Sequence, residues 1–157
     1  MREPTSVNQN SFNDRYEKMK RILLSAILAS ACAAAYAAPV SYEIDPMHTY
    51  PSFEADHMGI SFWRGKFNKT SGVMVLDKEA STGSVDVKID IASVDFGLDA
   101  MNEHAVSPEF FDSAKYPQAM YKGKLVDFVE GAPTRVVGEL TLHGVTRPVE
   151  LKINRFK

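Results

Sequence analysis

The segment Val85-Asp86-Val87-Lys88-Ile89-Asp90-Ile91 decides the fold class of this 157-residue chain. Its β-branched residues alternate with charged ones, so one face of the segment is apolar and the other is charged. A period of two residues is typical of a half-buried strand in an antiparallel sheet. The segment therefore predicts a sheet with one face on an apolar core and the other in water.

The same alternation recurs on both sides of this segment. Further strands are expected at residues 40–45, 52–57, 61–67, 73–77, 119–129, 134–142 and 149–154. Turn signals separate them at Gly59, Gly72, Thr82-Gly83, Gly131-Ala132-Pro133 and His143-Gly144. Many short antiparallel strands at this spacing predict an all-β sandwich or barrel.

The alternation stops between Asp99 and Asp112, where two short helical turns are expected. Asp99 can cap the first turn, and Ser107 followed by Pro108 has the composition of a second helix start. Phe110 and Phe111 follow, and two adjacent large aromatic side chains favour burial. We therefore expect this segment to cover one end of the β-structure.

The N-terminal region has the pattern of an export signal. Lys20-Arg21 precedes an apolar run, and Ala35-Tyr36-Ala37 has the small residues that a signal peptidase recognises. We expect residues 1–18 to be a disordered extension or a mis-called start, residues 19–37 to be a signal peptide cleaved after Ala37, and residues 38–157 to be the mature domain in the periplasm. Two alternatives are a transmembrane anchor, for which the apolar run is short, and a lipoprotein modified at Cys32.

The composition of residues 38–157 excludes several classes of protein. Without the five Lys/Arg and three Asp/Glu of residues 1–37, the chain has 13 basic and 17 acidic residues, a net charge of −4. No basic block points to nucleic acid or to an anionic membrane surface. The one cysteine of the chain lies before residue 38, so the stability of this domain must come from an apolar core rather than from a disulfide.

Candidate catalytic and metal sites are weak. The four histidines include no pair at helical spacing, and His48, Asp56 and His57 supply only some of the ligands that a zinc site requires. Hydrogen bonding in strands and turns is the simpler interpretation of these histidines. The sequence has no Gly-x-Ser-x-Gly turn, no phosphate-binding glycine loop and no nucleophile with a partner base. We expect neither an enzyme nor a metal or other cofactor.

A distinctive stretch is Leu140-Thr141-Leu142-His143-Gly144-Val145-Thr146-Arg147-Pro148-Val149. It resembles a hallmark of the YceI-like, polyisoprenoid-binding, lipocalin-like family. Further similar motifs follow the same order along the chain: Asp45-Pro46-x-His48, His57-Met58-Gly59-Ile60-Ser61, Arg64-Gly65-Lys66-Phe67, Ile91-Ala92-Ser93-Val94, Asn102 through Asp112, and Lys115-Tyr116-Pro117. Together they cover nearly all of residues 40–153.

The resemblance implies an antiparallel lipocalin-like β-barrel with one short helical segment, whose apolar interior holds a polyisoprenoid such as the tail of an isoprenoid quinone. Two departures stand out. Met101 and Asn102 occupy positions where members often carry an Arg-Asp pair, and Lys157 ends the chain where members usually continue with further strands. Either the barrel is incomplete or the sequence is a fragment of a longer chain. If the barrel is incomplete, we expect self-association through its open edges.

An isoprenoid offers almost only hydrocarbon, so the residues expected to line its site are those of the inward faces of the strands. The candidates are Phe53, Ala55, His57, Phe67, Val85, Val87, Ile89, Ile91, Val136, Leu140, Leu142, Leu151 and Ile153. Two other hypotheses stay open. In the first, the chain is an envelope-stress or interaction protein with a packed core and no ligand. In the second, His48, His57 and His143 form a metal site or the active site of a histidine-dependent enzyme.

Overall fold

The computed structural model describes Arg15, residues 17–20 and residues 38–157. Most of the expected signal peptide, residues 21–37 with Cys32, lies outside this described part. No helix among the described residues is long and apolar enough to cross a membrane. The fold below is that of residues 38–157.

The regular structure of residues 38–157 consists mainly of strands, as the alternation predicts. Besides the strands they contain one 3₁₀ helix, η1 (Ile91–Ser93), and one short α-helix, α2 (Asp99–Ala105). The strands are β1 (Val40–Glu43), β2 (Ser52–His57), β3 (Ser61–Phe67), β4 (Thr70–Asp77), β5 (Thr82–Asp90), β6 (Val94–Asp95), β7 (Gln118–Val129), β8 (Ala132–Leu142) and β9 (Val145–Lys152).

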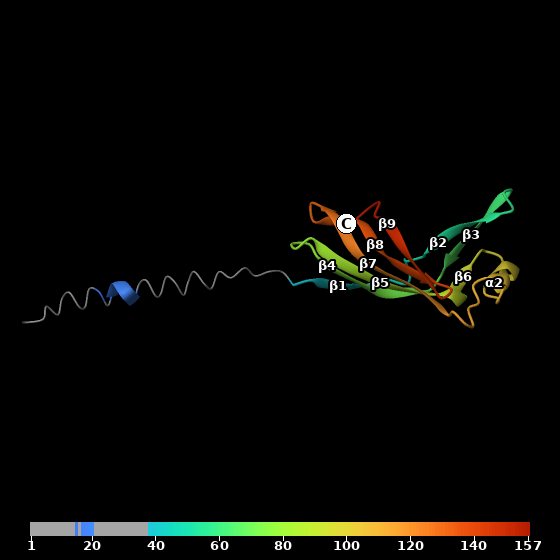
Figure 1. Ribbon diagram of the computed structural model, residues 1–157, viewed down its shortest axis with the longest axis horizontal. Coiled ribbons are helices and arrows are strands. Elements are labelled where there is room, and N and C mark those ends of the chain that lie inside the picture. Colours follow the sequence, from blue (N-terminus) through green and yellow to red (C-terminus); the bar gives the residue numbers. More distant parts are fainter. Residues whose placement is uncertain (1–14, 16, 21–37) are drawn as a thin grey trace, which may run out of the picture. The chain divides into compact units, whose positions relative to one another are not determined.

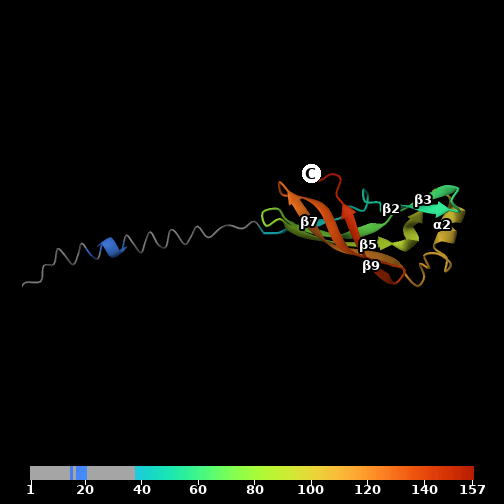
Figure 2. The ribbon, with the colours of Figure 1, turned by 45° about the horizontal axis from the view of Figure 1, so that its top comes forward.

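The strands form two antiparallel sheets (Figure 1). The larger sheet has the order β1-β4-β5-β7-β8-β9, and the smaller has the order β2-β3-β6. Figure 2 shows the β2–β3 hairpin and α2 at the same end of the β-structure. In the described part of the chain neither sheet closes on itself, so the structure is all-β and antiparallel without a closed barrel.

The predicted alternation in β5 is confirmed. Val85, Val87 and Ile89 stand opposite Gly123, Tyr121 and Ala119 of β7, and Ile89 is only 8% exposed. Ile91, which the sequence places in the same strand, instead begins η1, where the Asp90 carboxylate accepts a hydrogen bond from the Ala92 amide. It is nonetheless buried, because the turn directs its side chain into the core.

Two clusters of buried side chains hold the fold together. The first, called here the inter-sheet cluster, joins both sheets and α2 and is centred on Phe67, Ile89, Ile91, Val94, Ala105 and Ala119. The second, called here the large-sheet cluster, is centred on Leu76, Tyr121, Leu125 and Val136. The first cluster fixes the small sheet and α2 against the large sheet, as expected for a segment that covers one end of the β-structure.

The second expected helix is not formed. Residues 107–111 make turns instead, in which the amides of Phe110 and Asp112 both donate to the Ser107 carbonyl. Asp112 has a left-handed φ of 47°, which ends the turn. The first helix does form, but Leu98 rather than Asp99 is its N-cap residue.

Two expected turns lie inside strands. Gly72 belongs to β4 and Thr82-Gly83 to β5, and the chain reverses between them at residues 78–81. A Cβ on Gly83 would lie 2.6 Å from both Leu125 Cδ1 and the Val75 carbonyl oxygen. Close packing across the sheet therefore requires this glycine. In the sequence, such a glycine cannot be distinguished from one that forms a turn.

Candidate functional site

One face of the large sheet is apolar across five neighbouring strands and is called here the apolar face. Paired residues in adjacent antiparallel strands share a face, so the register defines its members. They are Met74 and Leu76 of β4, Val85, Val87 and Ile89 of β5, Ala119, Tyr121 and Leu125 of β7, Val136, Leu140 and Leu142 of β8, and Val145, Val149 and Leu151 of β9. Hydrocarbon dominates this face, which therefore suits an apolar ligand.

The structure brings most of the predicted lining residues into the two clusters. Phe53, Phe67, Val87, Ile89, Ile91 and Leu142 belong to the inter-sheet cluster, and Val85, Val87, Val136, Leu140 and Ile153 belong to the large-sheet cluster. Ala55, His57 and Leu151 are exposed and belong to neither. Leu151 nevertheless pairs with Val136 and so lies on the apolar face at the sheet edge. A role in ligand binding stays a prediction for all thirteen.

Sequence reasoning missed several members of this face, above all those of β7. Residues 119–129 are predicted as a strand, and the alternation of Ala119, Tyr121 and Leu125 would have identified them. It also missed Arg147, which stands opposite Leu140 and so brings a guanidinium to an otherwise apolar row. A charge on the inner side of an edge strand opposes pairing with another chain.

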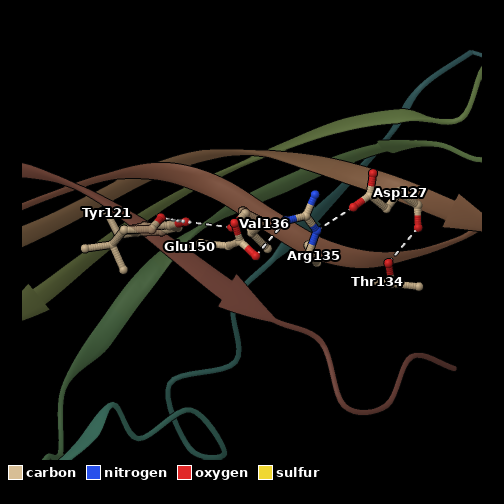
Figure 3. Close-up of polar contacts among 7 residues, drawn as sticks. Tyr121, Asp127, Thr134, Arg135, Val136 and Glu150 are labelled. Atoms are coloured by element: carbon tan, nitrogen blue, oxygen red, sulfur yellow. Dashed lines mark hydrogen bonds and ion pairs between the residues drawn. The ribbon is translucent and has the colours of Figure 1, made fainter.

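Tyr121 is the principal polar side chain within the large-sheet cluster. Its hydroxyl shares one proton between the carbonyl of Val149 at 3.0 Å and that of Val136 at 3.4 Å (Figure 3). Burial raises the pKa of the Tyr121 phenol, and the negative charge of Glu150 adds to the effect. The phenol is therefore neutral at physiological pH and connects β7 to β8 and β9.

Next to Tyr121, Arg135 links three strands on the solvent side of the large sheet. Its guanidinium donates to the Asp127 carboxylate and, at 2.7 Å, to Glu150 Oε1 (Figure 3). The Asp127 backbone has a φ of 54°, and its carbonyl accepts from the Thr134 hydroxyl. This conformation breaks the alternation of β7, so that Leu125 and Phe128, three residues apart, both pack in the large-sheet cluster.

Among the residues that the structure describes, Thr70 is the one polar residue that is buried. It is 3% exposed, pairs with Ile89, and its hydroxyl has no hydrogen-bond partner. A buried hydroxyl without a partner is destabilising by ~1–3 kcal/mol. Thr70 could not be identified from the sequence, because a threonine at the start of a strand is ordinary.

A hollow of ≈ 610 Å³ lies at the small sheet. Phe53, Gly65 and Phe96 supply its apolar part, and the Glu54–Arg64 ion pair, 2.7 Å between Nε and Oε1, lies at its rim. The Phe53 ring contacts those of Phe67, Phe96 and Phe111, with centroids 5.5–5.9 Å apart. The hollow therefore adjoins the inter-sheet cluster.

Asn102, one of the two departures from the family pattern, has a defined role. Its Oδ1 accepts a hydrogen bond of 2.7 Å from the Phe96 amide and so ties α2 to the end of β6. An aspartate would accept the same bond through a carboxylate oxygen, so the amide preserves this contact. Nearby, hydrogen bonds from the Gly97 amide and from Asn68 hold the pKa of the Asp95 carboxyl below its usual value.

The histidines lie in separate elements: His48 in the turn after β1, His57 at the end of β2, His104 in α2 and His143 in the β8–β9 turn. His48 Nδ1 lies 2.7 Å from Asp45 Oδ2, and this bond, with one from the Met47 amide, lowers the pKa of the Asp45 carboxyl. His57 contacts Trp63, and His143 contacts Tyr116. No group of three or more metal-binding side chains occurs among the described residues.

The His143-Gly144 motif is a tight turn locked by an aromatic ring. Both residues have left-handed φ angles, 52° and 75°, as a two-residue hairpin requires. The Tyr116 ring lies 4.3 Å from the His143 ring, and a Cβ on Gly144 would come within 2.7 Å of it. This packing accounts for the joint occurrence of Lys115-Tyr116-Pro117 and the His-Gly turn.

Comparisons with known proteins agree with this fold and these motifs. The family described as YceI-like domain matches residues 42–157. The UPF0312 protein VPA0850 of Vibrio parahaemolyticus is 37% identical over 139 residues, which cover 85% of this chain and 73% of the relative. Protein YceI of Escherichia coli O6:H1 is 35% identical over 138 residues, 85% of this chain and 72% of the relative. The chain belongs to the YceI-like family, as its motifs predict.

A solved structure supports the same conclusion. The crystal structure of the Campylobacter jejuni YCEI protein matches with a TM-score of 0.54 and 29% sequence identity, over 73% of this chain and 68% of that chain. The chain spans 64% of a mutant form of that protein. The all-β antiparallel architecture with a short helix is thus shared with YceI structures.

Proposed function

We propose that the mature protein is a periplasmic carrier that binds a polyisoprenoid lipid, such as an isoprenoid quinone, and performs no catalysis. The observation that carries this proposal is the apolar face, which spans β4, β5, β7, β8 and β9. An isoprenoid chain has almost no hydrogen-bonding groups, so its affinity must come from buried hydrocarbon, ~0.8 kcal/mol per CH₂. In this proposal the two sheets form walls of a lipocalin-like barrel around the lipid chain.

Membership of the YceI-like family supports the proposal, because the motifs in the sequence resemble those of a polyisoprenoid-binding family. Export is supported by the signal-like sequence from Lys20 to Ala37. N-terminal sequencing of the protein from a periplasmic fraction should begin at Ala38. A product that begins at Cys32 and carries lipid would instead establish a lipoprotein.

The ligand itself is tested by extraction. The protein is purified without detergent, extracted with organic solvent and analysed by mass spectrometry, with an unrelated exported protein as the control for background lipid. A polyisoprenoid enriched over the control, at a ratio approaching one per chain, is the expected result. A protein that contains no lipid and binds none of an added polyprenyl series would favour the alternative of a packed interaction protein.

A further inference from the structure

The tip of the β2–β3 hairpin carries an unusual concentration of exposed apolar side chains. Ile60 is 84% exposed, Met58 is 80% exposed and Phe62 is 62% exposed. Ile60 and Met58 are the two most exposed large apolar residues of the described chain. Figure 1 shows this hairpin (green) extending from the end of the β-structure.

The conformation of the turn does not explain the choice of these residues. Met58 and Gly59 have left-handed φ angles of 59° and 70°, a conformation for which Asn-Gly or Asp-Gly is preferred. The equivalent first residues of the other two such turns are polar, Glu130 and His143. A methionine in this position is unfavourable for the backbone and, when exposed, unfavourable for solvation. Its presence therefore points to a partner outside residues 38–157.

The tip does not need a partner for its backbone. The Ile60 amide donates to the His57 carbonyl at 3.1 Å, and the Gly59 amide donates to the Asp56 carboxylate at 3.0 Å. What the tip offers is hydrocarbon on a convex projection. Three side chains fall far short of the ~1,200 Å² that a stable protein interface buries, whereas a fluid bilayer surface surrounds a convex tip and covers it from all sides.

The charges around the tip favour an uncharged or zwitterionic surface. Residues 54–64 contain two carboxylates, Glu54 and Asp56, and one guanidinium, Arg64, which is paired with Glu54 at 2.7 Å. Attraction to anionic lipid requires clustered lysines or arginines. The hairpin has no such cluster, so any attachment must depend on apolar insertion and must be insensitive to salt.

Behind the tip, on the opposite face of β3 from Phe62, aromatic side chains lead into the interior of the fold. Trp63, next to Phe62, has its ring 6.3 Å from that of Phe96, which in turn lies 5.6 Å from Phe53 of the inter-sheet cluster. Aromatic side chains thus form a continuous apolar path from the hairpin to the core.

We propose that the β2–β3 hairpin docks the protein on a zwitterionic lipid bilayer by inserting Met58, Ile60 and Phe62 into its surface. This docking is a property of the hairpin and goes beyond lipid binding by the apolar face. It holds whether or not an isoprenoid occupies that face.

Trp63 is the single tryptophan of the chain and lies directly behind the tip, so its fluorescence reports insertion at this place. The full chain is mixed with phosphatidylcholine vesicles, with and without brominated acyl chains, at low and high salt. We expect a blue shift and quenching of Trp63 emission by the brominated lipid, unchanged by salt. The double variant Met58→Ser/Ile60→Ser should lose about tenfold or more of the vesicle affinity.

Val129→Ser is the matched control, because Val129 is 61% exposed beside the β7–β8 turn and lies outside the proposed surface. It should bind vesicles like the wild type. The proposal is overturned if Trp63 emission does not respond to vesicles, if the double variant binds as the wild type does, or if binding requires phosphatidylglycerol and disappears with salt. It is equally overturned if sedimentation shows that the double variant instead breaks a protein dimer.

Discussion

The hydroxyl of Thr70 lowers the stability of the protein although the side chain is well packed. Its side chain is buried opposite Ile89, yet its hydroxyl has no partner. Valine has nearly the same shape and no hydroxyl. We therefore expect Thr70→Val to raise the free energy of unfolding by ~1 kcal/mol in urea denaturation, while Thr70→Ala, which leaves a cavity, lowers it. A loss of stability in Thr70→Val would reveal a hydrogen bond that this account lacks.

Tyr121 makes stability depend on alkaline pH. Its pKa in the folded protein lies above the usual value of 10.0, because burial disfavours the phenolate. The unfolded chain therefore ionises first, so the stabilisation is complete below pH 10.0 and is lost as the pH rises toward the folded pKa.

Tyr121→Phe is the test of this coupling. It removes the bonds to Val149 and Val136 and should cost ~1 kcal/mol at neutral pH. Above pH ~10 its stability should fall less steeply than that of the wild type, as measured by urea midpoints across pH. Parallel pH curves for the two proteins would show that another group controls the alkaline transition.

At the scale of elements, turns of the same backbone conformation differ in what surrounds them. Gly144 and Gly59 both have left-handed φ angles, 75° and 70°, but a Cβ on Gly144 would come within 2.7 Å of the Tyr116 ring, and one on Gly59 would meet nothing within 4 Å. Gly59→Ala should lower the free energy of unfolding by only ~1 kcal/mol, because alanine must adopt a left-handed φ there. Gly144→Ala should cost more, by ~1–3 kcal/mol.

Thermal unfolding of the two alanine variants measures the difference in their stability. Combining Gly144→Ala with Tyr116→Ala should recover part of the stability lost in Gly144→Ala, because the smaller side chain at position 116 removes the clash. If the two single variants are equally stable, the Tyr116 ring does not lock the β8–β9 turn.

The strands were the most predictable elements, because period-two alternation is a local property of the sequence. The predicted bounds of β2 and β3 match the structure, and the apolar phase of β5 is confirmed by the burial of Ile89. The second helix was wrong because a helix start at Ser107-Pro108 does not by itself provide the residues that continue it. Gly83 was assigned to a turn because its actual cause, the approach of Leu125, is non-local.

At the scale of the whole molecule, the pairing of strands could not be read from the sequence. The placement of β1 beside β4, and of β2, β3 and β6 in a sheet of their own, depends on contacts between distant segments. The candidate site was therefore predicted in part. The apolar phases of β5 and β8 were correct, whereas Tyr121 and Thr70 were missed because their significance arises only when the strands are assembled.

The proposed polyisoprenoid site lies on the apolar face of the large sheet. β8 offers a matched pair of positions, since Leu140 lies on the apolar face and Val137 lies on the opposite, solvent-exposed face. Leu140→Asn places a polar amide on the proposed site, and Val137→Asn makes the same kind of change outside it. Thermal unfolding of both variants establishes that each is folded.

The decisive measurement is a titration of wild type, Leu140→Asn and Val137→Asn with an isoprenoid quinone and with a saturated alcohol of a few carbons as the apolar control. We predict saturable binding of the quinone by the wild type and by Val137→Asn, and a loss of about tenfold or more in Leu140→Asn. Equal affinity in the two folded variants, or no saturable binding by the wild type, would contradict the account.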